Sequence, residues 1–435
     1  MQVPADIENA HQRMVKAFIY TGLLFLLMPG TFLGVWNLIA ISNHRVAHSL
    51  SPAWIQAHGQ AQIFGWIGTF VIGIGLHSLS KMGGSLELAT RRGWQSWALW
   101  TIGITTRWIT GVYGWQWRVL LPLSTGLELV GCLVFFWTIR RHTAPPPVAL
   151  VANRRPKEIW MLLVISSTVC FLLSLLLNFG FALRISFVGS NPAMPQAYDQ
   201  RLLLVSAWGF LVLSVWGFNS RWLPIFLGLM KSSEKGLRVA LVTLVAALLL
   251  GMACTDIPAA CLLIMASLFA TWSLRVFHAN VSEPKLKGVH DTLPFFVKAA
   301  YFWLLIASGL TLGAALFDKN GGIVGASRHS ITVGFLATMV FAIGPKILPS
   351  FCGADPLFSG RLMFAALALL NTGCLLRVTS EIPAYEWNAA FAWEVLPVSA
   401  LIELAAVALF VTNLLVTFLR TTAHQKAAAP RVAAA

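Results

Sequence analysis

IWMLLVISSTVCFLLSLLLNFGFAL, residues 159–183, runs without a single charged side chain. An α-helix needs roughly 20 apolar residues to cross the hydrocarbon core of a bilayer. The stretch is long enough, and it lacks the alternation of apolar and polar residues typical of a barrel strand. Basic residues flank it, with Arg154, Arg155 and Lys157 before it and Arg184 after it. It is therefore predicted to be a membrane-spanning helix.

The whole chain shares this character. Of its 435 residues, 57% are hydrophobic and 11% are charged, whereas soluble proteins average about 25% charged residues. This composition excludes an ordinary soluble domain, a disordered protein and a nucleic-acid-binding domain, so membrane lipid rather than nucleic acid is the expected partner. The net charge of +15 comes from basic residues in short breaks between apolar runs, where such residues fix orientation in the membrane.

Twelve apolar segments are long enough, or nearly so, to cross a bilayer as helices. They occupy about 18–41, 55–79, 94–112, 119–139, 159–183, 202–218, 237–254, 257–276, 295–317, 329–348, 362–378 and 392–419. The fold class predicted from them is an all-α polytopic membrane protein, a bundle of about 12 transmembrane helices.

The basic residues test this count. Loops on the side of the N-terminus carry 23 Lys and Arg, the other side carries seven, and Arg107 is left inside a span. Positive residues favour the cytoplasm, so the N and C termini are predicted to be cytoplasmic.

We expect a single transmembrane domain, residues 1–423, followed by an alanine-rich and disordered tail, residues 424–435. A proline-rich, basic segment, residues 140–157, is expected to be a semi-rigid cytoplasmic connector. No internal repeat and no nucleotide-binding loop is apparent in the sequence.

Two histidines mark the strongest candidate site. His58 opens the second span in AHGQAQIFGW, and His329 opens the tenth in RHSITVGFLATM. Both spans run from outside to inside, so both imidazoles should lie at the same depth near the outer surface. Two such imidazoles on different helices can clasp one haem iron or share a metal. The alternative is a pair of interfacial histidines that hydrogen-bond to backbone or water.

Three residues near these histidines are candidates for cofactor contacts. Gln62 and Gly65 continue the helical face of His58, and Arg328 precedes His329. Gly65 leaves room either for a flat ring or for a close helix. His77 follows His58 by 19 residues, roughly 28 Å along a helix. It belongs to a second metal site at the cytoplasmic end or is an ordinary interfacial histidine.

A charged residue within a membrane span costs free energy, so each one requires a structural or functional explanation. Arg107 and Glu128 lie in neighbouring spans and are expected to form a pair, while Glu403 is either structural or part of a proton path. Near the outer surface, Arg377 and Glu381 stand four residues apart. They are able to pair with haem propionates or with each other.

Three motifs together resemble those of the NnrS family, twelve-span membrane proteins associated with bacterial responses to nitric oxide and reported to carry haem and copper. The motifs are RHSITVGFLATM in the tenth span, AHGQAQIFG in the second span, and RWLPIF, residues 221–226, after the sixth span. The resemblance implies a multi-pass protein of the bacterial inner membrane that holds haem near the periplasmic face through His58 and His329. Nitric oxide or an electron-transfer protein would be its partner.

The sequence departs from this family at two places. Where the family commonly has His-x-His-Glu, the chain has His58, Gly59, Gln60 and Ala61, and where it often has His-Thr-Gly, the chain has Phe351, Cys352 and Gly353. Two candidate ligand positions are thus absent, which argues against copper and indicates a divergent branch.

Two other functions are considered. A secondary transporter would use Arg107, Glu128 and Glu403 as coupling residues. A haem–copper-type oxidase or nitric oxide reductase would need about six span histidines, with His-His and His-x-His pairs; neither pair occurs here, and only His58, His77 and His329 lie in or at the ends of spans. The sequence does not decide whether the protein catalyses, senses or transports.

Overall fold

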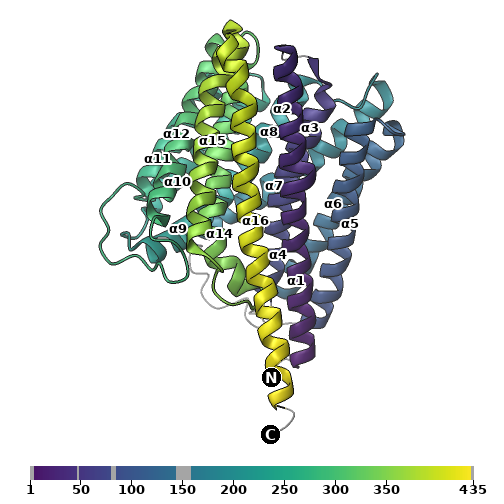
Figure 1. Ribbon diagram of the computed structural model, residues 1–435. Helices are drawn as coiled ribbons and strands as arrows, with labels where there is room; N and C mark the ends of the chain where they lie inside the picture. The colour runs from purple at the N-terminus through teal and green to yellow at the C-terminus, as the bar shows by residue number, and fades with distance from the viewer. Residues whose placement is uncertain (1–3, 47–48, 80–84, 144–157, 433–435) are drawn as a thin grey trace, which may run out of the picture.

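The computed structural model describes residues 4–46, 49–79, 85–143 and 158–432. Within these residues the protein consists of helices and their connections, without a β-strand. The helices stand side by side in one bundle, and α1 begins and α16 ends at the same end of it (Figure 1). We call the opposite end the distal end. Most of the predicted 140–157 connector lies outside the described residues.

Consecutive helical elements join into twelve rods, four of which contain a π-helical segment, denoted η. The first six rods are α1–η1–α2 (Ala5–Phe25, Leu26–Phe32, Leu33–His44), α3–η3–α4 (Pro52–Gln60, Ala61–Gly68, Thr69–Leu79), α5 (Leu86–Tyr113), α6 (Trp117–Thr143), α7 (Ile159–Val188) and α8–η5–α9 (Gln196–Leu203, Leu204–Val212, Leu213–Leu227). The last six are α10 (Glu234–Met252), α11 (Asp256–Ser273), α12 (Leu293–Phe317), α13–η6–α14 (Gly322–His329, Ser330–Ala337, Thr338–Phe351), α15 (Gly360–Trp387) and α16 (Ala390–Val432). Each predicted span overlaps one rod.

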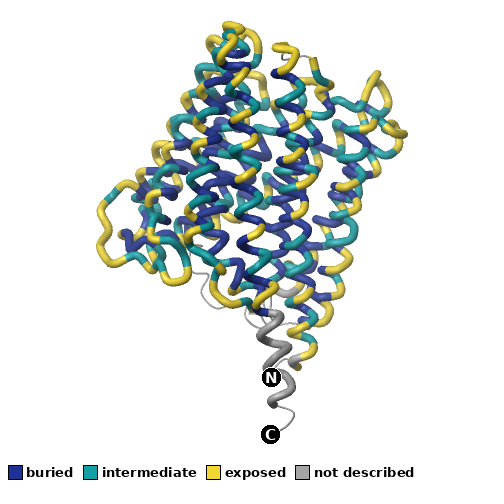
Figure 2. The backbone as a smooth tube through the Cα atoms, viewed as in Figure 1, coloured by how far each residue is buried: buried dark blue, intermediate teal, exposed yellow. Residues whose placement is uncertain are grey.

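Eleven rods of the described chain are long and apolar enough to cross a membrane. The remaining rod, α5, packs along the whole of α6 but carries Glu87, Arg91, Arg92 and Arg107. Large apolar side chains are exposed on many rods, and the buried positions face the interior of the bundle (Figure 2). The protein is therefore a multi-pass helical membrane protein. The backbone of α16 stays helical through Val432, within the alanine-rich segment.

Local sequence explains where several rods begin and end. The hydroxyls of Ser85, Ser233 and Ser359 each accept a hydrogen bond from the backbone N–H three residues later, which satisfies a donor that the first turn leaves unpaired. Gly114 ends α5 with φ 64° and Gly228 ends α9 with φ 63°, a left-handed conformation that glycine adopts without steric cost.

The twelve rods repeat one pattern of four. In each quartet the second rod contains a π segment, namely η3, η5 or η6, that begins eight or nine residues after the rod's first residue. The third and fourth rods then form a tight hairpin, and these hairpins, α5–α6, α10–α11 and α15–α16, are the most extensively packed pairs in the described structure. The bundle is thus built from three four-helix units.

The second rods of the three units form the centre of the bundle. Between 67% and 72% of the residues in their apolar windows are buried, against 33–50% in the other eight apolar rods. A glycine in each π segment permits a side chain from a neighbouring helix to approach the backbone closely. A Cβ on Gly65 would lie 3.1 Å from Phe25, one on Gly209 would lie 2.9 Å from Cys170, and one on Gly334 would lie 2.5 Å from Trp303.

The sequence repeats together with the structure, although no repeat is apparent before the helices are aligned. In the fourth rods, residues 121–129 read LPLSTGLEL and residues 396–404 read LPVSALIEL. In the third rods, residues 103–107 read GITTR and residues 373–377 read GCLLR. A Cβ on Gly103 would meet Glu128 and Ser124, and a Cβ on Gly373 would meet Glu403 and Ser399 in the same way. The first and third units are therefore equivalent in detail.

Gly334→Ala should destabilise the protein by about 1–3 kcal/mol, because the added methyl group would overlap the inner atoms of the Trp303 side chain, which cannot swing away. Gly309→Ala in α12 is the matched control, since no atom lies within 4 Å of the position that its added methyl group would take. Thermal unfolding in detergent, followed by tryptophan fluorescence, measures both. Equal unfolding temperatures for the two variants would contradict the close packing of η6.

Candidate functional site

His58 lies near the distal start of its rod and is held by the first rod of the same unit. Its Nδ1 lies 2.9 Å from the carbonyl oxygen of Gly30, within η1. That segment contains Pro29, which has no N–H to donate and so disturbs the α-helical ladder. The ring packs against Gly34, where a Cβ would lie 2.6 Å from the imidazole Cε1. Gly30 and Gly34 together fix the orientation of this imidazole.

His329 is the last residue of α13, immediately before η6. Its Nδ1 lies 3.0 Å from the carbonyl oxygen of Gly325 and 3.3 Å from Oε2 of Glu381. Glu381 comes from α15, and it reaches this position because Gly325 has no side chain to block its carboxylate. Backbone and carboxylate acceptors thus converge on one nitrogen of this imidazole.

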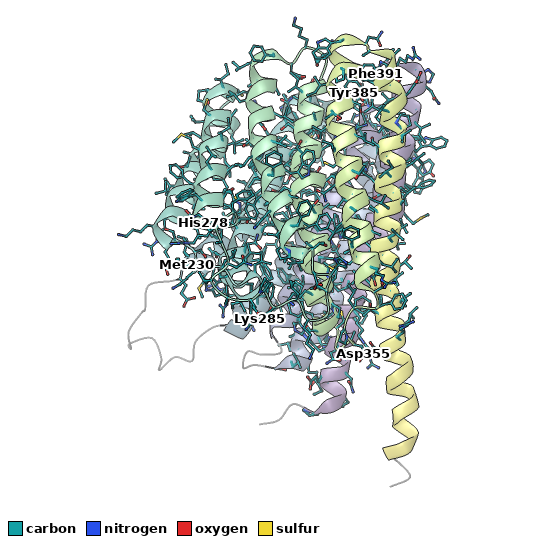
Figure 3. The ribbon with its side chains drawn as sticks, turned by 60° about the vertical axis from the view of Figure 1, so that its left-hand side comes forward. Met230, His278, Lys285, Asp355, Tyr385 and Phe391 are labelled. Atoms are coloured by element: carbon teal, nitrogen blue, oxygen red, sulfur yellow. The ribbon has the colours of Figure 1, made fainter. Side chains whose placement is uncertain are left out.

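Glu381 also forms a buried ion pair. Arg377 Nη2 donates to Glu381 Oε1 at 3.1 Å, and the two side chains are 9% and 3% exposed. Tyr385, one turn further along α15, adjoins the same guanidinium. Figure 3 shows Tyr385 at the distal end of the bundle, far from Lys285 and Asp355 at the other end. The ion pair therefore lies in the distal half of the bundle.

His58 and His329 both lie near the distal starts of their rods, in the first and third units. His58 lies within electrostatic range of both His329 and Arg377. In each histidine the Nδ1 faces a fixed backbone carbonyl, which favours the tautomer that leaves Nε2 as an acceptor. Metal-binding histidines are held in this way, because a hydrogen bond at one nitrogen sets the direction of the other.

Two further acidic residues extend the site. Glu403 of α16 lies within electrostatic range of His329, Arg377 and Glu381, and its Oε1 is buried without a hydrogen-bond partner among the described residues. Arg328 Nη2 donates to Asp199 Oδ2 at 3.1 Å, which joins α13 to α8. All three units therefore contribute charged side chains to the distal half.

A second polar cluster lies in the first unit. Glu128 of α6 is fully buried, and its Oε2 accepts hydrogen bonds from Gln60 Nε2 at 3.0 Å and Asn178 Nδ2 at 3.4 Å. Arg107 of α5 is 4% exposed and lies within electrostatic range of Glu128 and Asp199. The predicted Arg107–Glu128 pair is present as an electrostatic attraction between the two side chains.

The internal repeat relates the two clusters residue by residue. When Gly65 is matched with Gly334, Gln60 corresponds to His329. The hairpins likewise match Arg107 with Arg377 and Glu128 with Glu403. In the middle unit the position of this glutamate is occupied by Ile264, within α11. Two of the three units therefore keep a buried arginine and a glutamate, of which Glu128 is fully buried and Glu403 is partly exposed.

Three other predicted site residues contact neighbouring helices. Gln62 Nε2 donates to Thr31 Oγ1 at 3.0 Å and so joins η3 to η1. Gly65 packs against Phe25 and Ile104, the close-helix alternative. His77 stacks on Phe351, with ring centroids 4.7 Å apart, about 28 Å along the rod from His58.

Sequence reasoning missed Gln60, Asn178, Asp199 and Gly34. Neutral amides and glycines occur throughout membrane helices, so their types carry no signal of a site. The equivalence of Gln60 with His329 was the one available clue, and it emerges only once the units are aligned.

A metal site requires several side chains with donor atoms close together. Among the described residues, no group of three or more His, Cys, Asp or Glu is arranged to hold a metal ion. Cys352, at the position where the NnrS family often has a histidine, is fully buried, and burial raises the pKa of its thiol to about 12. Burial thus keeps this thiol protonated unless a metal ion displaces the proton.

The fold and these clusters define a multi-pass helical membrane protein with paired arginine and glutamate side chains inside its bundle. A family model described as "Domain of unknown function (DUF8744)" matches residues 169–418. This is more than half of the chain, and the chain belongs to this family. The matched part runs from α7 to α16 and so includes most of the second and third units. No curated protein matches the chain.

Glu381→Gln should lower the free energy of unfolding by about 3–5 kcal/mol, because it leaves the buried Arg377 guanidinium without its countercharge. Glu394→Gln is the control, since Glu394 is 76% exposed and 3.9 Å from Arg45, and surface pairs contribute about 0–1 kcal/mol. Denaturant or thermal unfolding in detergent compares the two. Similar losses would show that the buried ion pair does not stabilise the bundle.

Maleimide should modify the exposed Cys254 in the folded protein and leave the buried Cys352 unmodified, because the thiolate is the reactive form. Mass spectrometry of peptides labelled in detergent identifies the modified residues, with Cys254→Ser as the control. Modification of native Cys352 at neutral pH would contradict its burial.

Proposed function

We propose that the protein is an NnrS-like haem-binding membrane protein that acts in the response to nitric oxide. His58 and His329 would hold the haem near the distal end. The observation that carries the proposal is the common orientation of these two imidazoles, each held through Nδ1 by a backbone carbonyl and each within electrostatic range of the other. The association with nitric oxide rests on the three sequence motifs.

The surrounding residues suit the acidic groups of a haem. Nε and Nη1 of Arg377 are buried without an acceptor among the described residues, so this guanidinium has donors for a propionate. Arg328 supplies a second positive charge beside His329. A bound haem would supply an iron able to bind nitric oxide or to transfer one electron. The role of this chain is to orient the two imidazoles and to balance charge.

The proposal includes a topology. All twelve rods would span the bacterial inner membrane, with α5 as the twelfth span held against α6, and the distal end would face the periplasm. Both termini would then be cytoplasmic, as the distribution of Lys and Arg indicates. An electron-transfer partner or nitric oxide itself would approach from the periplasmic side.

Protein expressed with added haem precursor should show a Soret band that shifts on reduction with dithionite. His58→Ala and His329→Ala should each abolish the band or greatly weaken it, whereas His77→Ala should retain it. Gly34→Ala keeps both ligands but pushes against the imidazole of His58, so it should weaken haem binding without removing a donor. Visible absorption of the purified protein in detergent measures all four.

A folded but colourless wild-type protein would overturn the haem proposal. A band that survives both histidine variants would place the haem elsewhere. Gel filtration of every variant, compared with wild type, establishes that loss of colour is not loss of fold.

A second function, secondary transport coupled through Arg107, Glu128 and Glu403, gains support from the internal repeat. Repeated units with a polar site in each are typical of transporter folds. The substrate would bind near the middle of the bundle, and flux into proteoliposomes of wild type, Glu128→Gln and Glu403→Gln would test it. Haem content distinguishes this function from the first.

A further inference from the structure

We propose that Glu128 is a proton-exchanging carboxyl group, reached from the distal end of the bundle through Asp199 and Arg328. Its site consists of Glu128, Arg107, Gln60 and Asn178. The inference deepens the transport alternative but does not require haem, and its readout is separate from that of haem binding.

The first support is the difference between the equivalent clusters. In the third unit Arg377 has its own countercharge, Glu381, four residues along α15. In the first unit the corresponding position after Arg107 is Gly111. Arg107 therefore has two acidic groups within electrostatic range, Glu128 and Asp199, and is bound tightly to neither. Glu128 is able to change its charge while Asp199 continues to balance Arg107.

The second support is the set of unpaired polar atoms at the site. Glu128 Oε1, Arg107 Nε and Asn178 Oδ1 are all buried without a hydrogen-bond partner among the described residues. One acceptor of a carboxylate, one donor of a guanidinium and one amide acceptor thus lie within the same cluster. Such atoms are normally satisfied by bound water or by a proton on the carboxyl group.

The third support is the balance of charge in the distal half. Arg107, Arg328 and Arg377 form a continuous electrostatic network with four carboxyl groups, those of Glu128, Asp199, Glu381 and Glu403. When all seven groups are ionised, these three arginines and four carboxyl groups leave one excess negative charge. One bound proton on a carboxyl group balances it, and a poorly solvated environment favours that balance.

The groups around Glu128 define where the proton enters. Arg107 faces it from α5, Gln60 from α3 and Asn178 from α7, while α4 contributes His77 only at the opposite end of the rod. Asp199 lies next beyond Arg107, and its ion pair with Arg328 is 18% exposed on the Asp199 side. A proton arriving from water at this ion pair binds to the Glu128 carboxylate as an O–H bond, and on release it returns to water.

Infrared difference spectra recorded on a pH change, in H2O and in D2O, test the proposal on the full chain in lipid. Wild type should show a protonated-carboxyl band that shifts in D2O. Glu128→Gln should lose this component, and Glu403→Gln and Glu394→Gln should retain it. A wild-type spectrum without the band, or a band unchanged in Glu128→Gln, would overturn the proposal.

Two further variants keep the test decisive. If Glu128→Gln does not fold, Gln60→Leu leaves the carboxyl in place but removes a hydrogen bond to it, so the band should change frequency; an unchanged frequency would refute the assignment. Asp199→Asn should slow deuterium exchange of the band several-fold, whereas Asp355→Asn, at the other end of the bundle (Figure 3), should not. Equal rates in both would exclude entry through Asp199.

Discussion

The ion pair between Arg377 and Glu381 is the contact on which the distal half of the bundle depends. Charges buried among membrane helices are costly unless paired, and here one carboxylate meets both a guanidinium and an imidazole. Glu381 approaches His329 only because Gly325 leaves the space open. Glu381 thereby links Arg377 of α15 to the imidazole of His329 at the end of α13.

The first and third units share one arrangement of helices but differ in the side chains at their polar clusters. The backbone relation of glycine, arginine and glutamate is identical in the α5–α6 and α15–α16 hairpins, yet a histidine in one unit is replaced by Gln60 in the other. Gln60 has no ionisable group, whereas His329 carries an imidazole. In the first unit Gln60 donates a hydrogen bond to Glu128, while in the third His329 lies beside the carboxylate of Glu381. The middle unit has an apolar residue at the glutamate position and contributes Asp199 from its second rod.

Hydropathy predicted the helices well because length and apolarity alone decide whether a segment crosses a bilayer. It also predicted that His58 and His329 lie near the same end of the bundle, since both open spans that run in the same direction. It could not reveal the π segments, because Ala61–Gly68 and Leu204–Val212 share no residue pattern that separates them from α-helix. Nor could it find Asn178, an amide within an otherwise ordinary apolar helix. The repeat escaped notice because its matching residues are distributed over two rods and diluted by interchangeable apolar side chains.

The π segments of the three second rods, η3, η5 and η6, have a consequence for how such a bundle can evolve. Each π turn holds one more residue than an α turn, so removal of one residue would restore α geometry and rotate everything beyond it by about 100°. In the second rod this would turn the face that carries Thr69 relative to the face that carries His58, with no change in the length of either half. Single-residue insertions or deletions in these three segments thus rotate one half of a rod relative to the other in discrete steps. The side chains at the distal end and those at the opposite end of the same rod can therefore change their direction independently.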